Sequence, residues 1–230
     1  MNQVVQQSLQ PKGIPQERCL FPVPLYFTSR DLDLVLENEK EKKEIEDIIK
    51  EGMTENYQNL QSDNSHIFDT KLHNLKKFIE GHIKTYVKNI LNPVEELDFY
   101  ITQSWINLNK PGHGHFKHSH ANSILSGIYY IATVENDGVS FHDPNAKIKH
   151  HLAFESKEDE RGEYVQKGIS QAASADMRVN TGDLLIFPSW LEHGVESNPK
   201  ATTNRISLAF NTFVNGTFGC EQQLNELILS

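Results

Sequence analysis

Residues 184–195 read LLIFPSWLEHGV, and this stretch decides the fold. The apolar run at 184–187 has the length of a buried strand, Pro188 and the residues after it indicate a turn, and a second short run begins at His193. Many short strands separated by glycine, asparagine and proline predict a β-sandwich or open barrel. Comparable runs of aliphatic and aromatic residues lie at 97–108, 124–134, 139–142, 179–187 and 205–214.

The first hundred residues have a different pattern, which predicts helices. Apolar residues at 68, 72, 75, 78, 79, 83, 87 and 91 step mostly by three and four, and Asn92-Pro93 ends the run. Before it, the charged stretch 31–51 acquires helical spacing in its second half, with Ser29 as a candidate N-cap. We interpret 19–28, which is apolar and broken by prolines, as an edge strand and 56–64 as a polar connector.

The chain therefore divides into an arm and one domain. Residues 1–18, rich in glutamine and proline, are predicted to be a loose arm, and residues 19–230 a single domain. That domain is expected to have a helical buttress at about 29–92 and a β core at about 97–214. The polar, charged segment 144–178 has no strong period, and a loop of that length predicts a lid over a site.

Composition and charge exclude several classes of protein. The formal net charge is −9 and no basic run is present, which argues against nucleic acid and anionic membranes as partners. The two cysteines, Cys19 and Cys220, make no disulfide framework. No apolar leader or membrane-length run is visible, so the expectation is a cytoplasmic protein without a signal peptide. The oligomeric state stays open.

Histidines gather in the segment PGHGHFKHSH, residues 111–120. Residues two apart on an extended strand point to the same face, so His118 and His120 can bind one metal ion. His193, beyond a buried strand and a turn, is the candidate third ligand. His113 and His115, flanked by glycines, are interpreted as loop residues. A histidine pair alone is more often a surface or hydrogen-bonded pair, so this prediction depends on the conjunction with His193.

The ligand types indicate the chemistry. Three protein ligands on one face of an octahedral ion leave three positions open, which suits a bidentate cosubstrate and O₂ at Fe(II). The usual facial set is two histidines and one carboxylate. Here His120 stands in the carboxylate position, unless Asp143 or Glu192 enters the site.

Twelve residues after His193, the pattern Arg205-Ile206-Ser207 adds a second signal. Strand alternation puts Arg205 and Ser207 on one face, where a guanidinium and a hydroxyl suit a carboxylate. Because a buried arginine without an anionic partner is unfavourable, a structural salt bridge at the start of this strand is the alternative interpretation.

Together these segments resemble the 2-oxoglutarate/Fe(II) oxygenase superfamily, and within it the small bacterial and phage oxygenases. The prolyl hydroxylases are similar in layout but more distant. The resemblance covers about 97–214 and implies a mostly β fold with α: a double-stranded β-helix (jelly-roll) core buttressed by N-terminal helices. The motifs that carry it are Trp105-Ile-Asn107, His118-Ser-His120, Ser126-Gly-Ile-Tyr-Tyr130, Phe187-Pro-Ser-Trp-Leu-Glu-His193 and Arg205-Ile-Ser207.

The resemblance also implies a role for each matched residue. His118 and His193 become iron ligands, with His120 as the third. Arg205 pairs with the distal carboxylate of 2-oxoglutarate. Further residues assigned to the cosubstrate are Ser207, Tyr130 and Asn107. The departure from the superfamily is at residue 120, where Asp or Glu is usual; a neutral ligand leaves the iron one unit more positive and alters its redox poise.

The implied activity is that of a dioxygenase with Fe(II), 2-oxoglutarate and O₂. It couples oxidation of a substrate to decarboxylation of 2-oxoglutarate to succinate. By analogy with the prolyl hydroxylases, the substrate is a peptidyl side chain such as proline, or a small molecule. Two alternatives remain at this stage. A cupin-type metalloenzyme usually adds a glutamate that residues 121–132 lack and leaves Arg205 without a purpose, and a non-catalytic jelly-roll binding module leaves the histidines without one.

Overall fold

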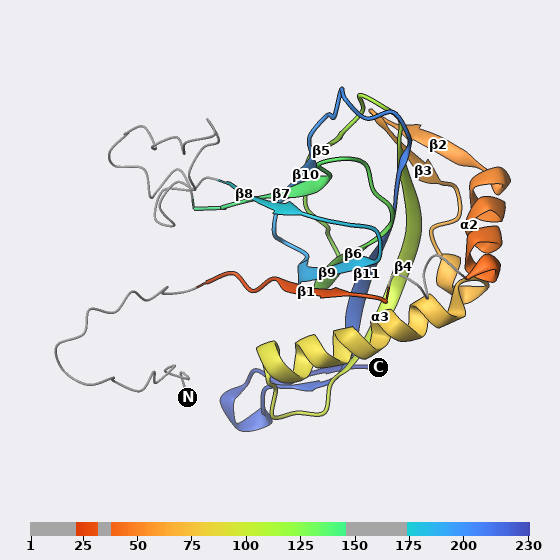
Figure 1. The fold of residues 1–230 in the computed structure, drawn as a ribbon. Coiled ribbons are helices and arrows are strands. Elements are labelled where there is room, and N and C mark those ends of the chain that lie inside the picture. Colours follow the sequence, from red (N-terminus) through yellow and green to blue (C-terminus); the bar gives the residue numbers. More distant parts are fainter. Residues whose placement is uncertain (1–21, 32–37, 146–173) are drawn as a thin grey trace, which may run out of the picture.

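The computed structural model describes residues 22–31, 38–145 and 174–230 (Figure 1). The predicted arm and most of the predicted lid lie outside these residues. The helical elements are α2 (Glu39–Glu51), η1 (Ile67–Asp69), α3 (His73–Tyr86), the π-helical η2 (Val87–Leu91) and η3 (Glu221–Gln223). The strands are β1 (Tyr26–Ser29), β2 (Met53–Asn56), β3 (Asn59–Ser62), β4 (Asp98–Asn109), β5 (His115–His118), β6 (Leu125–Ala132), β7 (Gly138–His142), β8 (Ser174–Arg178), β9 (Asp183–Pro188), β10 (His193–Val195), β11 (Arg205–Phe218) and β12 (Leu227–Leu229).

Two antiparallel sheets face each other and form the jelly roll. Within the described residues the larger sheet has the order β1-β9-β6-β11-β4-β3-β2, with β12 paired to β11, and the smaller has the order β5-β10-β7-β8. From β4 to β11 the chain alternates between the sheets, staying in the smaller one only for the β7–β8 pair. This is the connectivity of a double-stranded β-helix, so the predicted fold class is confirmed.

The larger sheet has a core on each of its faces. Its outer face carries Ile106, Leu208 and Phe210, which pack with buried residues of the helices, such as Ile79. Its inner face carries residues that pack against the smaller sheet; they are Ile128, Tyr130, Leu185 and Phe187. Because side chains alternate along a strand, neighbouring residues point to opposite faces of the larger sheet: Ile106 points to the outer face and Asn107 to the inner face. The same alternation directs the polar side chains of β4 and β11 into the space between the two sheets.

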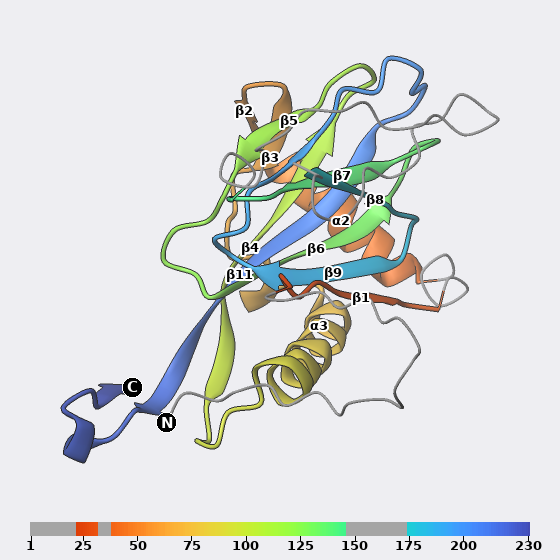
Figure 2. The same ribbon diagram turned by 90° about the vertical axis from the view of Figure 1, so that its left-hand side faces the viewer.

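The two longer helices cover the outer face of the larger sheet, on the side away from β5, β7, β8 and β10 (Figures 1 and 2). Helix α3 buries a stripe spaced by three and four residues: Leu75, Ile79, Ile83 and Tyr86. It passes into η2, and Asn92 ends that turn in a left-handed conformation with φ 46° before Pro93. The predicted helical buttress is present.

Two local predictions need correction. Ser29 ends β1, its hydroxyl donates to Asp183 at 2.6 Å, and the cap of the described helix α2 is Asn38, whose side chain accepts from the Glu41 backbone N–H at 3.1 Å; residues 32–37 lie outside the described residues. The predicted polar connector at 56–64 contains a tight hairpin instead. Its strands β2 and β3 lie at the edge of the sheet and are largely polar, so they show no apolar alternation that sequence could reveal.

The described residues contain no helix that is long and apolar enough to cross a bilayer.

We expect Ile79→Ala to destabilise the protein by about 2–5 kcal/mol, because it leaves a cavity where α3 packs on the sheet. The free energy of unfolding is measured by urea denaturation. Val94→Ala is the control: it also truncates an aliphatic side chain, but Val94 is 90% exposed, so the change should stay within about 0.5 kcal/mol. Equal losses in both variants would contradict this description of the core.

Candidate metal and cosubstrate site

Three histidines converge between the sheets. His118 ends β5 and His193 begins β10, and these two residues are direct partners in the antiparallel pairing of the two strands. His120 lies just beyond β5 rather than on it, so the strand-alternation argument for His118 and His120 was wrong although the two side chains do meet. One ligand atom from each of the three side chains lies within 4.8 Å of the others, a spacing that fits a single metal ion.

Backbone contacts orient the imidazoles. His118 donates from Nδ1 to the Phe116 carbonyl at 2.8 Å, and His193 donates from Nδ1 to the Leu191 carbonyl at 3.0 Å. Such bonds fix the tautomer and leave Nε2 with its lone pair for a metal. His120 is placed through its main chain instead, because its backbone N–H donates to the Ser189 carbonyl at 3.0 Å.

Burial also keeps two of these rings neutral. It lowers the pKa of His193 to about 3, with smaller effects from the neighbouring histidines, and it lowers the pKa of His120 to about 4. A neutral imidazole is the form that binds metal. Neither Asp143 nor Glu192 joins the cluster within the described residues. The Lys117 ammonium lies 2.8 Å from Glu192 and lowers the pKa of that carboxyl, and Glu192 does not line the cavity of the histidines.

Arg205 lies at the start of β11, with its side chain buried among polar partners. Its Nε donates to both oxygens of Asp137, at 2.9 and 3.1 Å, and the exposed side-chain fractions of the two residues are only 6% and 2%. Its Nη1 donates to Ser207 at 3.2 Å and to Asn109 at 3.4 Å. The alternative interpretation, a structural salt bridge, therefore describes one edge of the guanidinium.

The other edge of Arg205 is free. Nη2 is buried without a hydrogen-bond partner among the described residues, and so is the hydroxyl of Tyr130, whose ring lies 5.1 Å below the guanidinium carbon. Burial raises the pKa of Tyr130, so its hydroxyl remains a donor. Two buried donors without acceptors are costly, and a ligand carboxylate would satisfy them.

The remaining predicted residues, Ser207, Asn107 and Tyr130, lie side by side on adjacent strands of the larger sheet. Ser207 on β11 is paired with Asn107 on β4 and with Tyr130 on β6. The side-chain Oδ1 of Asn107 accepts from Nδ2 of Asn59 at 2.7 Å, which leaves the side-chain NH₂ of Asn107 as a donor for the interior. Ser207 and Asn107 line the same cavity as the histidines.

This inner cavity joins the histidines to Arg205, and its free volume is about 30 Å³, room for roughly two water molecules. A five-carbon dicarboxylate is larger, so its entry requires a lining side chain to move. Trp105 and Phe187 line the cavity, whereas Phe116 and Trp190, 45% and 54% exposed, do not.

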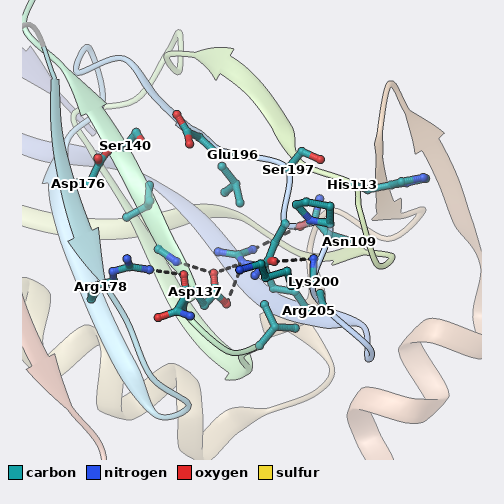
Figure 3. A pocket seen from close by; sticks show the side chains of 18 of the residues that line it. Asn109, His113, Asp137, Ser140, Asp176, Arg178, Glu196, Ser197, Lys200 and Arg205 are labelled. Atoms are coloured by element: carbon teal, nitrogen blue, oxygen red, sulfur yellow. Dashed lines mark hydrogen bonds and ion pairs between the residues drawn. The ribbon is translucent and has the colours of Figure 1, made fainter. Parts of the chain in front are cut away.

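A second, outer cavity of about 320 Å³ lies beyond Arg205 (Figure 3). Arg205 and Val195 line both cavities, and the outer one carries charges of both signs, among them Lys110, Asp176 and Glu196. Figure 3 shows Asp137 beside Arg205, joined by the dashed contacts already described. Arg205 therefore separates the metal end of the barrel from this polar opening.

Sequence reasoning missed four residues of the site. Asp137 and Asn109 hold Arg205, and Asn59 holds Asn107. None belongs to a motif, and only strand register brings them to their partners. His115, interpreted as a loop residue, instead begins β5 and lines the inner cavity. Its glycine neighbours suggested a loop, but Gly114 is buried against the backbone of residues 195–197.

Residues 103–211 match a family model described as "Putative 2OG-Fe(II) oxygenase". The matched segment contains the three histidines, Arg205 and Ser207. No curated protein matches the chain.

Solved structures of similar fold include HygX from Streptomyces hygroscopicus with nickel, 2-oxoglutarate and hygromycin B bound. It is 10% identical, with a TM-score of 0.52 over 83% of this chain and 82% of that one. The non-heme alpha ketoglutarate dependent carbocyclase SnoK from nogalamycin biosynthesis is 12% identical, with a TM-score of 0.54 over 83% and 79%. A Burkholderia pseudomallei oxidoreductase of the 2OG-Fe(II) oxygenase family is 8% identical, with a TM-score of 0.53 over 82% and 83%. At these identities the likeness is one of fold.

We expect His193→Ala to lose divalent metal, because His193 is the most buried of the three histidines and its Nε2 has no substitute. Metal content after anaerobic dialysis against limiting Fe(II) measures this. His113→Ala is the matched control, since His113 is exposed and outside the cluster. Retention of stoichiometric metal by His193→Ala would show that the cluster is not the metal site.

Proposed function

We propose that the protein is a 2-oxoglutarate-dependent oxygenase whose iron is held by His118, His120 and His193. The observation that carries the proposal is the convergence of three imidazoles with the unpaired edge of Arg205 on one cavity. A cupin-type metalloenzyme would explain the histidine cluster but not Arg205. A non-catalytic binding module would not explain the histidine cluster. The family match also favours the oxygenase.

The same cavity supports a binding mode for 2-oxoglutarate. The two donors that lack partners, Arg205 Nη2 and the Tyr130 hydroxyl, suit the distal carboxylate, and Ser207 adds a third polar group. The side-chain NH₂ of Asn107, which is paired with Ser207 across the sheet, can donate a further hydrogen bond to the ligand. A dicarboxylate held at this end can then reach the histidines with its other end, because both ends line one cavity.

When bound, the iron couples decarboxylation of 2-oxoglutarate to succinate with oxidation of a second substrate. The chain's own contribution is geometric and electrostatic. Backbone carbonyls orient His118 and His193, Asp137 fixes Arg205, and the apolar walls formed by Trp105 and Phe187 limit water in the cavity.

We propose hydroxylation of a peptidyl side chain, such as proline, or of a small molecule. Support comes from an exposed aromatic pair beside the metal cluster. The rings of Tyr57 and Phe116 lie 4.9 Å apart, and the Phe116 ring lies 5.1 Å from that of His118. Tyr57 is 76% exposed, so this pair offers an apolar surface next to the histidines on which an apolar part of the substrate can pack.

We expect anaerobic addition of 2-oxoglutarate to the Fe(II) protein to produce a visible metal-to-ligand charge-transfer band. The double variant Arg205→Leu/Asp137→Asn should need about a hundredfold more 2-oxoglutarate, because it removes the buried charge that pairs with a carboxylate. The double variant is chosen because Arg205→Leu alone would leave Asp137 buried and unpaired, at a cost of about 3–5 kcal/mol.

Two controls accompany this titration. Iron content and thermal midpoint should match the unmodified protein, since neither residue belongs to the metal cluster. An unchanged 2-oxoglutarate requirement in the double variant would remove Arg205 from the binding mode. Absence of the band in the unmodified, iron-loaded protein would overturn the cosubstrate itself.

We expect His120→Asp to retain Fe(II) and His120→Ala to bind it about 10- to 100-fold more weakly, because a carboxylate can replace the imidazole as a ligand and a methyl group cannot. Fe(II) dissociation constants from anaerobic calorimetry measure this. If His120→Ala binds iron as tightly as the unmodified protein, His120 is no ligand and only lines the site.

A further inference from the structure

His115 is a fourth histidine of the inner cavity, and the metal cluster does not include it. It begins β5, three residues before His118, and the register of β5 against β10 shifts between its two ends. This bulge allows both side chains to turn inward, although strict alternation would separate them. The two rings lie 4.5 Å apart between centroids.

His115 lines the inner cavity together with the metal cluster and Arg205. Its ring is near enough to His118, His193 and Arg205 for their charges to act on it. A dicarboxylate that reaches from the metal cluster to Arg205 would therefore lie in a cavity that this ring lines. Gly194, which lines the same cavity, lies against β5 at this level, and a Cβ there would approach the His115 carbonyl to 3.1 Å.

The hydrogen bonding of His115 differs from that of the other cavity residues. His118, His193 and Arg205 are held by hydrogen bonds to backbone or side-chain oxygens, whereas neither ring nitrogen of His115 has a hydrogen-bond partner among the described residues. Its ring packs against Phe116 and His118, with centroids 5.1 and 4.5 Å away, but no hydrogen bond fixes it. Because the cavity holds only about 30 Å³, a ring without such a bond can adjust to a ligand at lower cost than the rings that are hydrogen-bonded.

We propose that His115 is a cosubstrate-binding residue, whose ring turns to admit 2-oxoglutarate and then donates an N–H to one of its carboxylate oxygens. This rests on the proposed function and deepens it, because one carboxylate of the ligand then has a further donor besides the metal and Arg205. A donor to an ionised carboxylate is a strong contact in a dry cavity, so its loss should be measurable as affinity.

The experiment compares three variants of the full chain, each loaded anaerobically with Fe(II) and titrated with 2-oxoglutarate by calorimetry. His115→Leu keeps much of the bulk and removes both N–H groups, His115→Gln keeps an N–H donor, and His113→Leu makes the same change at an exposed histidine two residues away. We expect the 2-oxoglutarate dissociation constant to rise about 10- to 100-fold in His115→Leu, less in His115→Gln, and not at all in His113→Leu.

Fe(II) affinity, measured separately, should be the same in all three variants. Three results would overturn the inference: unchanged 2-oxoglutarate affinity in His115→Leu, tighter binding in that variant, which would mean that the ring only fills space, or loss of iron comparable to that of His193→Ala. Failure of the unmodified, iron-loaded protein to bind 2-oxoglutarate would instead reject the proposed function, and His115's role with it.

Discussion

The antiparallel pairing of β10 with β5 is the contact on which the site depends. It puts His193 directly opposite His118, and these two residues are 75 positions apart in the chain. Strand β11 provides the second constraint, because its pairing with β4 and β6 aligns Ser207 with Asn107 and Tyr130. A slip of one residue in either pairing would turn these side chains to the opposite face, so strand register alone determines whether the two halves of the site face one cavity.

A buried polar network stabilises the loop that carries His120. Ser189 donates or accepts at 2.7 Å with Ser123 and at 2.8 Å with Ser126, and Ser126 donates to Asn211 at 2.8 Å. The Ser189 carbonyl then accepts from the His120 backbone N–H. Since each member of this network is satisfied, it adds rigidity without the cost of unpaired groups, and it positions His120, which lies on no strand.

Sequence predicted the parts of this protein that have a period or a motif. The apolar stripe of α3 follows from spacing, and strands β4, β6, β9 and β11 follow from their apolar runs. His193 is expected near His118 because it follows a buried strand and a turn. The β2–β3 hairpin and the inward turn of His115 could not be predicted, because polar edge strands lack alternation and a bulge breaks it. Asp137 could not be predicted either: it lies in a turn before β7, and only folding brings its carboxylate to Arg205.

Asp137 and His120 are connected through charge. With a divalent ion, three neutral imidazoles leave two positive charges at the metal, while Arg205 and Asp137 cancel each other. In the usual set a carboxylate ligand removes one charge from the metal, and an arginine without an acidic partner would supply one at the far end. Under the proposed ligand set, both arrangements present two positive charges to a dicarboxylate, and Asp137 supplies the negative charge that His120 omits. The larger net charge would then lie at the metal, while Arg205 would orient the distal carboxylate through its N–H donors.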